Sequence, residues 1–474
     1  MTEFLPYTIS WNLTQRCNQQ CAHCYLSAFP HATSTEELTT QECFRVMDEM
    51  AGVNPDLLLI LTGGEPFLRK DLFDLAGHAV DRGFTVVLGT NGFLLREKQA
   101  TAMRQHGIQG ASISLDSTDP VRHDAFRQFP GSWEGAIRAT EVLRAEGLPF
   151  SLHMSVTEWN VGEIPAMIDL ARHLDARVLN LFFLVRTGRG EGLTDIPAVE
   201  YERVLTEVAR AQRDAPAVVQ QSLQENGGSE ESWGRELGRA GGLVIRAKCA
   251  PFFRRILYGL DPASVLLRNF AEGSCPAGRH YCRIMPNGDV TACPYMPVVA
   301  GNLRQTPFGD LWPDASIFQD LRKGKLGGRC GSCEFSRICG GCRCRAYATF
   351  GDYLAEDPAC AYQPGAYGGR VIELPAHQAF GMRVEHTLTW SVEAQARLKE
   401  IPGFARGMVV AGVEQYARDR RMVVITPELM QEVRGRVAGR FPLFRRERGH
   451  GPAPEEPTTA SSLNVDGSSL KTHL

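Results

Sequence analysis

The sequence lacks several features that mark whole classes of protein. None of its apolar runs reaches the roughly 18 residues that a membrane-spanning helix needs. Its 51 Lys and Arg nearly balance its 54 Asp and Glu, and the net charge of −3 favours neither nucleic acid nor an anionic membrane surface. The start Met-Thr-Glu-Phe-Leu-Pro has no basic stretch followed by an apolar one, so no secretory signal is expected. These absences predict a cytoplasmic protein, and its length of 474 residues predicts about two to four domains.

Cysteine, by contrast, is abundant and clustered. The chain has 14 cysteines, and without an export signal clustered thiols indicate metal binding rather than disulfides. Cys17, Cys21 and Cys24 are spaced C-x3-C-x2-C directly after the apolar stretch Tyr7–Leu13. Soft sulfur ligands favour iron–sulfur chemistry, and a [4Fe–4S] cluster normally takes four cysteines, so a triplet leaves one iron with an open position. The alternatives are a chance grouping or a zinc site with His23 as the fourth ligand.

A glycine motif follows at the end of the next apolar run. Leu57–Leu61 leads into Thr62-Gly63-Gly64-Glu65-Pro66, and glycines let a backbone approach a ligand closely. Together with the cysteine triplet, this motif resembles the radical S-adenosylmethionine (SAM) enzymes, in which the triplet follows the first barrel strand and SAM chelates the open iron. The resemblance implies that a reduced [4Fe–4S] cluster cleaves SAM to a 5′-deoxyadenosyl radical. It also implies a reducing partner such as flavodoxin or ferredoxin.

The same resemblance implies residues that bind SAM. Gly63 and Gly64 would hold the methionyl amine through the backbone, and Glu65 would hold it by charge. Ser114 and Arg127 match family positions that bind the methionyl carboxylate, for which an arginine fork is well shaped. A surface ion pair is the alternative interpretation of Arg127. The sequence identifies no further catalytic residue.

Strand and helix patterns alternate through the first 200 residues and predict an α/β fold. Six βα units indicate a parallel sheet covered by helices. Periodicity leaves an open doubly wound sheet and a partial barrel as alternatives. The family resemblance implies a partial (β/α)6 TIM barrel with its site at the C-terminal strand ends. The predicted strands are Tyr7–Leu13, Leu57–Leu61, Thr85–Gly89, Ala111–Leu115, Phe150–Val156 and Val178–Val185, and the predicted helices lie near 38–50, 71–82, 96–106, 131–146, 160–174 and 196–215.

Composition divides the chain into five segments. The barrel is expected over residues 1–215, and a linker or loop rich in Gln, Glu, Gly and Ser over 216–248. A cysteine-dense domain is expected over 249–365, a small all-α domain over 382–440, and a disordered polar tail over 449–474.

The cysteine-dense segment carries enough thiols for two complete [4Fe–4S] clusters, or for a pair of zinc ribbons. Its spacing resembles the SPASM extension of radical SAM enzymes, although the last pair is C-x2-C followed by Cys344, where the family usually has C-x3-C. The resemblance implies a first auxiliary cluster on Cys275, Cys282, Cys293 and Cys342, and a second on Cys330, Cys333, Cys339 and Cys360. Because of the departure from the usual spacing, Cys344 is an alternative to Cys342 as a ligand. Cys249 is a spare thiol that can replace Cys282 or leave one cluster open to substrate.

Two further stretches bear on the substrate. Arg329–Tyr347, followed by Gly351–Pro358, resembles the radical enzymes of haem d1 synthesis and of the alternative haem pathway. The stretch from Trp390 to Glu428 resembles the helical domain that ends the B subunit of light-independent protochlorophyllide reductase. These resemblances favour an oxidoreductase that decarboxylates or dehydrogenates a tetrapyrrole carboxylate side chain. A maturase of a ribosomally made peptide, of the mycofactocin or quinone-cofactor type, is the second hypothesis, and a non-catalytic iron–sulfur electron carrier is the third.

Overall fold

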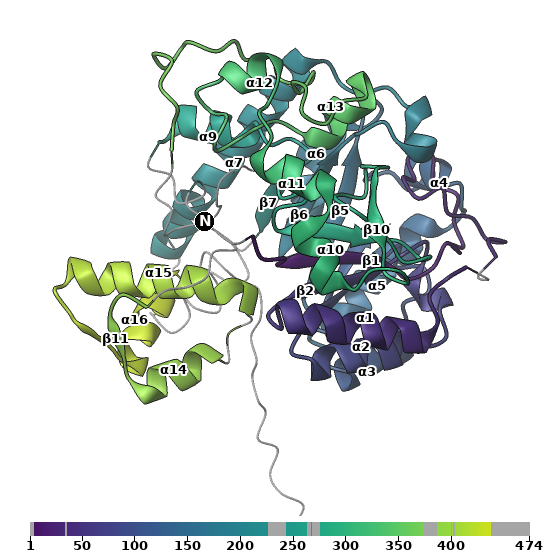
Figure 1. Cartoon of the computed structure of the whole chain (residues 1–474), viewed down its shortest axis with the longest axis horizontal. Coiled ribbons are helices and arrows are strands. Elements are labelled where there is room, and N and C mark those ends of the chain that lie inside the picture. The colour runs from purple at the N-terminus through teal and green to yellow at the C-terminus, as the bar shows by residue number, and fades with distance from the viewer. Residues whose placement is uncertain are drawn as a thin grey trace, which may run out of the picture. The chain divides into compact units, whose positions relative to one another are not determined.

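The computed structural model describes residues 4–33, 36–225, 243–262, 267, 275–373, 386–399, 401 and 403–437. Within these ranges a ten-stranded sheet has the order β10-β9-β8-β1-β2-β3-β4-β5-β6-β7 (Figure 1). Strands β8 and β1 to β7 run parallel, whereas β9 pairs antiparallel with both β8 and β10. The strands are β1 (Thr8–Asn12), β2 (Leu58–Thr62), β3 (Thr85–Thr90), β4 (Ala111–Ser114), β5 (Phe150–Val156), β6 (Val178–Phe183), β7 (Val244–Lys248), β8 (Tyr281–Ile284), β9 (Asp289–Thr291) and β10 (Val299–Asn302).

Helices connect successive parallel strands, as expected for βα units. The six strands and six helices predicted for the barrel segment are all present, and α4 is an additional helix. Its start is encoded by Asp119 and Pro120, because the Asp119 carboxylate accepts the Arg122 N–H and proline suits the first turn. The helices are α1 (Thr40–Val53), α2 (Leu72–Asp81), α3 (Glu97–Gln105), α4 (Pro120–Arg127), α5 (Ser132–Ala145), α6 (Ile164–His173) and α7 (Ala198–Glu225).

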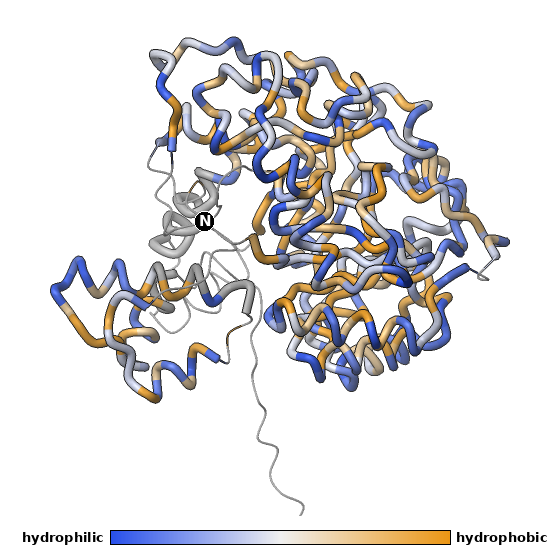
Figure 2. The backbone as a smooth tube through the Cα atoms, in the orientation of Figure 1, coloured by the Kyte–Doolittle hydropathy of each residue, from blue (hydrophilic) through white to orange (hydrophobic). Residues whose placement is uncertain are grey.

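The two faces of the sheet differ in polarity, because successive strand side chains point to opposite sides. Ile9 and Trp11 of β1 are fully buried in the apolar core. Ser10 and Asn12 alternate with them and make polar contacts, to the hydroxyls of Tyr281 and Tyr25. In Figure 2, hydrophobic residues gather at the centre of the part of the molecule that contains the ten-stranded sheet. We call the side of the sheet that carries Ser10 and Asn12 the lumen.

The expected linker over 216–248 is in part regular structure. Helix α7 continues to Glu225, and Val244–Lys248 forms β7, a seventh parallel strand at the sheet edge. The sequence interpretation missed β7 because two of its five residues, Arg246 and Lys248, are cationic. The remaining part of that segment, 226–242, lies outside the described residues, as does the predicted tail 449–474.

The cysteine-dense segment continues the sheet and then forms short helices. Strand β8 pairs with β1, so this segment adds directly to the barrel edge opposite β7. Its helices are α9 (Phe253–Leu260), α10 (Phe308–Asp314), α11 (Ser316–Lys323), α12 (Gly328–Ser332) and α13 (Arg343–Phe350).

The C-terminal described residues form a small unit with a core of its own, which includes Trp390, Val413 and Ile425. The buried carboxylate of Glu414 accepts the Trp390 indole N–H at 2.9 Å. The expected helical character of this C-terminal region is confirmed, with one short pair of parallel strands added. The elements are β11 (Thr389–Trp390), α14 (Val392–Lys399), α15 (Gly403–Asp419), β12 (Val424–Ile425) and α16 (Pro427–Val437). In the part of the chain that is described, no helix has the length and apolarity to cross a bilayer.

Candidate active site and cysteine centres

The cysteine triplet lies on residues 13–33 after β1, here called the triplet loop. Cys17 and Cys21 are buried and Cys24 is half-buried. The Gln19 N–H donates to Cys17 Sγ at 3.4 Å, and burial raises the pKa of the Cys17 thiol to about 12. A thiolate is disfavoured there without a compensating cation. Three sulfurs held beyond the C-terminal edge of a parallel sheet form a donor set that fits an iron–sulfur cluster.

The glycine motif packs directly against the triplet loop. The Gly64 N–H donates to the Thr14 carbonyl at 2.7 Å, and the Glu65 N–H donates to the Arg16 carbonyl at 2.8 Å. A Cβ atom on Gly64 would lie 2.1 Å from the Arg16 carbonyl oxygen and 3.0 Å from Cys17 Cβ. Only glycine fits at this position, so the end of β2 packs directly against the backbone of the triplet loop.

Glu65 is fully buried beside this contact. Thr90 Oγ1 donates to its Oε1 at 2.7 Å, and the Asn91 N–H donates to its Oε2 at 2.9 Å. Burial raises the pKa of Glu65 to about 7, although these donors oppose the shift. The carboxyl is therefore poised between its two protonation states near neutral pH, and a neighbouring ammonium group would favour the ionised form. Asn91 Nδ2 in turn lies 3.9 Å from Cys17 Sγ.

Arg127 is buried rather than exposed, which excludes the surface ion pair. Its Nε and Nη2 lie 2.7 and 2.6 Å from Asp116 Oδ2, and Nη1 lies 3.6 Å from Cys21 Sγ. Asp116 Oδ1 accepts the Ser155 N–H at 2.8 Å. The guanidinium therefore ties the triplet loop to the ends of β4 and β5. The fork that the family resemblance assigns to a methionyl carboxylate is turned towards Asp116.

Ser114 is the last residue of β4 and lies beside His153 of β5 in the sheet register. It thus reaches the same C-terminal edge as Glu65 and the triplet loop. Burial lowers the pKa of His153 to about 3, so its imidazole is neutral. The structure therefore brings every residue predicted for SAM binding to one edge of the sheet.

His23, the candidate fourth ligand of a zinc site, packs against an aromatic side chain instead. Its ring stacks on Phe126, with centroids 4.8 Å apart and planes 7° apart, and burial lowers its pKa to about 4. Over the described ranges, no three His, Cys, Asp or Glu side chains converge on a single metal ion. A four-iron cluster distributes its sulfur ligands over separate irons, so it does not require such convergence.

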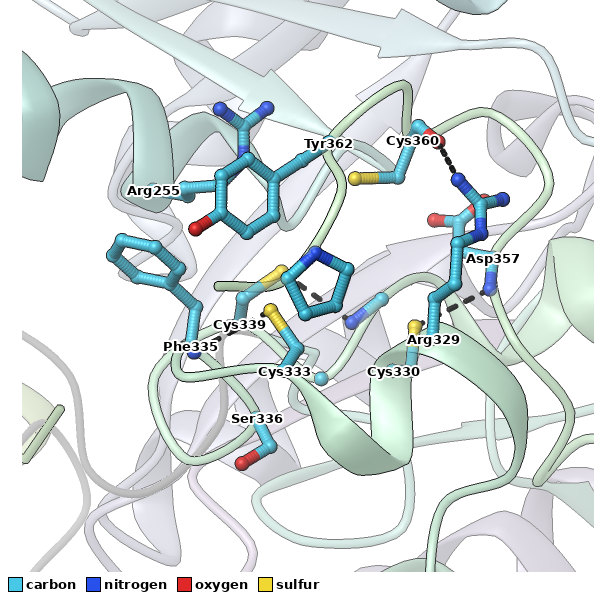
Figure 3. A pocket seen from close by; sticks show the side chains of 13 residues that line it. Arg255, Arg329, Cys330, Cys333, Phe335, Ser336, Cys339, Asp357, Cys360 and Tyr362 are labelled. Atoms are coloured by element: carbon cyan, nitrogen blue, oxygen red, sulfur yellow. Dashed lines mark hydrogen bonds between the residues drawn. The ribbon is translucent and has the colours of Figure 1, made fainter. Parts of the chain in front are cut away.

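Four cysteines of the cysteine-dense segment line one cavity, which Figure 3 shows from close by. The N–H groups of Asp357, Phe335 and Gly341 donate to three of the sulfurs, each at 3.4 Å. Such amide-to-sulfur hydrogen bonds stabilise thiolate ligands and tune iron–sulfur clusters. The four sulfurs belong to Cys330, Cys333, Cys339 and Cys360, the set expected for the second auxiliary cluster.

A second group of thiols lies near the C-terminal end of β7. The thiol of Cys342 interacts by hydrogen bonds with those of Cys249 and Cys344, and the thiol of Cys344 with that of Cys293. Cys275 is close enough to interact electrostatically with Cys293 and Cys342. This group therefore contains both Cys342 and Cys344, the two alternative ligands, and also Cys249, the alternative to Cys282.

Cys282 does not join that group, which corrects its expected place in the first auxiliary cluster. It pairs with Ile9 in the sheet register, and both side chains are fully buried on the apolar side. Its neighbour Tyr281 faces the lumen, where its hydroxyl contacts Ser10. Because strand side chains alternate, Cys282 points away from Cys293, and Arg322 is the charged group that acts on its thiol.

Sequence reasoning missed a residue that links the two cysteine groups. Asp357 Oδ2 accepts the Cys342 N–H at 2.7 Å, while the Asp357 N–H donates to Cys330 Sγ. The buried Arg345 pairs with Asp357 at 3.4 Å and donates to the Cys249 carbonyl at 2.9 Å. A charged pair inside a cysteine-rich stretch was the available signal, but its partners could not be inferred from spacing.

Comparisons with known proteins agree with this geometry. The chain matches the radical SAM superfamily over residues 11–171 and the iron–sulfur cluster-binding SPASM domain over 275–334. Residues 390–434 match the proto-chlorophyllide reductase 57 kD subunit.

Full-length relatives extend the match. The chain is 36% identical to an AdoMet-dependent heme synthase of Methanosarcina barkeri, over 76% of this chain and 97% of that protein. It is 34% identical to an AdoMet-dependent heme synthase of Nitratidesulfovibrio vulgaris, over 75% and 92%, and 29% identical to a mycofactocin maturase of Mycolicibacterium smegmatis, over 76% and 84%. The crystal structure of Streptococcus suis SuiB bound to S-adenosylmethionine shares the fold, with a TM-score of 0.57 and 15% identity over 76% of this chain and 78% of that one.

These matches establish an enzyme whose barrel domain binds SAM and a [4Fe–4S] cluster and whose SPASM domain binds auxiliary iron–sulfur clusters. The cysteine triplet, the Gly64 contact and the cavity of four thiols provide sites of the right chemistry for these groups. The chain belongs to the radical SAM enzymes that carry a SPASM domain, in the family that includes the AdoMet-dependent heme synthases.

Proposed function

We propose that this enzyme modifies a carboxylate side chain of a haem-precursor tetrapyrrole, by decarboxylation or dehydrogenation. The observation that carries the proposal is the 36% identity to a heme synthase of which the chain covers 97%. A second heme synthase matches nearly as well, whereas the mycofactocin maturase is more distant.

The cofactor supplies the hard chemistry: when bound and reduced, the cluster with SAM yields a 5′-deoxyadenosyl radical that abstracts hydrogen from an unactivated carbon. Cys17, Cys21 and Cys24 are proposed to hold that cluster. Glu65 is proposed to bind the methionyl amine.

The remaining residues orient these groups. Gly63 and Gly64 admit SAM by their lack of side chains, and Ser114 is proposed to bind the methionyl carboxylate. We assign Arg127 as a positioning residue, because its nitrogens contact Asp116 and Cys21.

For the auxiliary centres we propose one cluster on Cys330, Cys333, Cys339 and Cys360, which line a common cavity. We propose that the first auxiliary cluster is held by Cys249, Cys275, Cys293 and Cys342, with Cys249 in the place of Cys282. Cys344 remains beside it as a fifth sulfur.

We further propose a cytoplasmic location and a reducing partner such as flavodoxin or ferredoxin. No disulfide joins any of the 14 cysteines, which is consistent with a reducing compartment and with cysteines that serve as cluster ligands. Loss of one hydrogen atom and one electron from a propionate side chain would release CO2 and leave a vinyl group, so an electron acceptor is needed as well as a donor.

The test begins with anaerobic reconstitution of the holoprotein. With dithionite and SAM the enzyme should form 5′-deoxyadenosine, and changing Cys17, Cys21 and Cys24 to alanine should abolish this product while removing only about four irons. Formation of the product excludes an electron carrier, whereas its absence from the wild type would contradict the proposal.

Substrate class is tested separately by titrating the enzyme with iron-coproporphyrin and sirohaem derivatives. We expect a shift of the Soret band on binding and, under turnover, loss of CO2 from the macrocycle by mass spectrometry. If none of these compounds shifts the band, a peptide substrate is favoured instead.

A further inference from the structure

The lumen side of β7 carries two cations. Arg246 and Lys248 lie beside Asn180 and Phe182 of β6 in the sheet register. Their neighbours Ile245 and Ala247 pack in the apolar core with Leu179 and Leu181 on the other side of the sheet. Because strand side chains alternate, both cations face the lumen.

Neither cation has a carboxylate partner among the described residues, although the adjacent Cys249 thiol acts electrostatically on Lys248. Among the described residues, neither Arg246 nor Lys248 forms an ion pair or a hydrogen bond through its side chain, and no carboxylate is close enough to influence Arg246. Both side chains are half-buried, and loss of hydration lowers the pKa of Arg246. Half-buried side chains on this face of the sheet remain partly accessible to a ligand in the lumen.

The pair is close to the proposed SAM site. The imidazole of His153 on β5 is influenced by the charges of Lys248 and Arg246, and also by Arg127 and Asp116. Phe182 packs on His153, with ring centroids 5.0 Å apart. His153 therefore lies between the β7 cations and the side of the lumen that holds the cysteine triplet.

The charge balance of this part of the lumen favours an anionic guest. Asp116, the carboxylate in contact with Arg127, already accepts from Arg127 and from the Ser155 N–H. His153 is neutral, so it cannot contribute or offset charge. A poorly hydrated cation is costly unless an opposite charge accompanies it, and these two cations lie two residues apart on the same face of β7.

We propose that Arg246 and Lys248 bind the carboxylate side chains of the substrate inside the barrel and so orient the macrocycle towards the SAM site. This inference rests on the proposed function and adds to it the residues that recognise the substrate. The arginine fork can hold one carboxylate by two hydrogen bonds, and the lysine offers a point charge to the same or to a neighbouring carboxylate. The rings of Phe182 and His153, which pack against each other at a tilt of 52°, supply an aromatic surface beside the charges.

The experiment measures equilibrium binding to the reconstituted enzyme by the Soret band, without turnover. Iron-coproporphyrin is compared with its tetramethyl ester in the same detergent, for the wild type and for Arg246→Gln and Lys248→Gln. We expect each variant to bind the free acid about tenfold or more weakly, since a charge-assisted hydrogen bond is lost. The ester should bind the wild type weakly and should respond little to either substitution.

Two further variants control for folding and for general charge effects. Arg246→Lys keeps the cation and should retain most of the affinity that Arg246→Gln loses, provided both contain the wild-type amount of iron. Arg172→Gln removes an exposed arginine of α6 and should leave binding of the free acid unchanged.

The outcomes separate this inference from the proposed function. If the wild type binds iron-coproporphyrin but both glutamine variants bind it equally well, the inference is wrong and the proposed function stands. If the variants lose affinity for SAM as much as for the porphyrin, the pair serves the cofactor and the inference is also wrong. If the wild type binds no tetrapyrrole, the proposed function fails and this inference fails with it.

Discussion

Replacing Arg127 with methionine tests the ion pair that anchors the triplet loop. The Asp116 side chain is 0% exposed and that of Arg127 is 8% exposed. Methionine preserves much of the side-chain volume but leaves the Asp116 carboxylate buried with the Ser155 N–H as its remaining donor among the described residues. Removing one partner of a buried ion pair costs about 3–5 kcal/mol. This is a large fraction of the roughly 5–15 kcal/mol by which native proteins are stable.

Two comparisons isolate the cause of the loss. Asp116→Asn removes the negative charge at nearly constant shape, so the Arg127→Met/Asp116→Asn double variant should recover about 2 kcal/mol relative to the sum of the single losses. Arg122 lies on the same helix but forms a partly exposed pair with Glu163. Arg122→Met should therefore cost about 1 kcal/mol or less.

The assay is anaerobic urea unfolding of the reconstituted protein, followed by tryptophan fluorescence, with the reduction potential of the triplet cluster as a second measurement. Since Arg127 Nη1 lies near Cys21 Sγ, its removal takes a cation and a donor from a cluster ligand and should make the potential more negative. The reasoning is refuted if Arg127→Met costs no more than Arg122→Met, or if the single losses simply add.

Three further outcomes follow from contacts elsewhere. Cys249→Ala should lower the iron content by about four per chain, whereas Cys282→Ala should leave it unchanged, and the reverse result in iron analysis would restore Cys282 as a ligand. Gly64→Ala should prevent cluster assembly at the triplet, because the new methyl group would overlap the Arg16 carbonyl; normal EPR of that cluster would contradict this. Burial lowers the pKa of His123 to about 4, below its unfolded value of 6.5. His123 therefore contributes stability that is complete above pH 6.5 and is lost as pH falls towards 4, by about 1.4 kcal/mol per pH unit. His123→Asn should flatten the urea midpoint over that range, and an unchanged slope would show that the imidazole titrates normally.

Strands β1 to β6 could be predicted from the sequence because each is a short apolar run bounded by turn residues. The triplet and Gly63-Gly64-Glu65 were identified for a related reason: their spacing is local and the chemistry of thiols and glycines is restrictive. Strand β7 was missed because it lines the lumen with Arg246 and Lys248. A functional strand of this kind departs from the apolar pattern at the positions that face the ligand.

The ligand sets show where spacing stops being informative. Cys282 has the right separation from Cys293, yet the strand between Tyr281 and Ile284 turns it to the apolar side. Cys249 lies 26 residues before Cys275 and joins the group only because β7 ends there. A face assignment needs the sheet register, and the register depends on contacts between β8 and β1, which are more than 250 residues apart in sequence.

The position of β7 connects substrate recognition to the first auxiliary centre. Lys248 is the last residue of the strand and faces the lumen, and Cys249 follows it with φ +60°, a left-handed conformation that is unfavourable for a side chain larger than glycine. This turn directs the Cys249 thiol to Cys342 instead of continuing the strand. Arg345 holds the Cys249 carbonyl and so fixes the turn. Lys248, which is proposed to bind a substrate carboxylate, is thereby joined by one peptide bond to a proposed cluster ligand, so the proposed substrate site and the proposed cluster site share the end of β7.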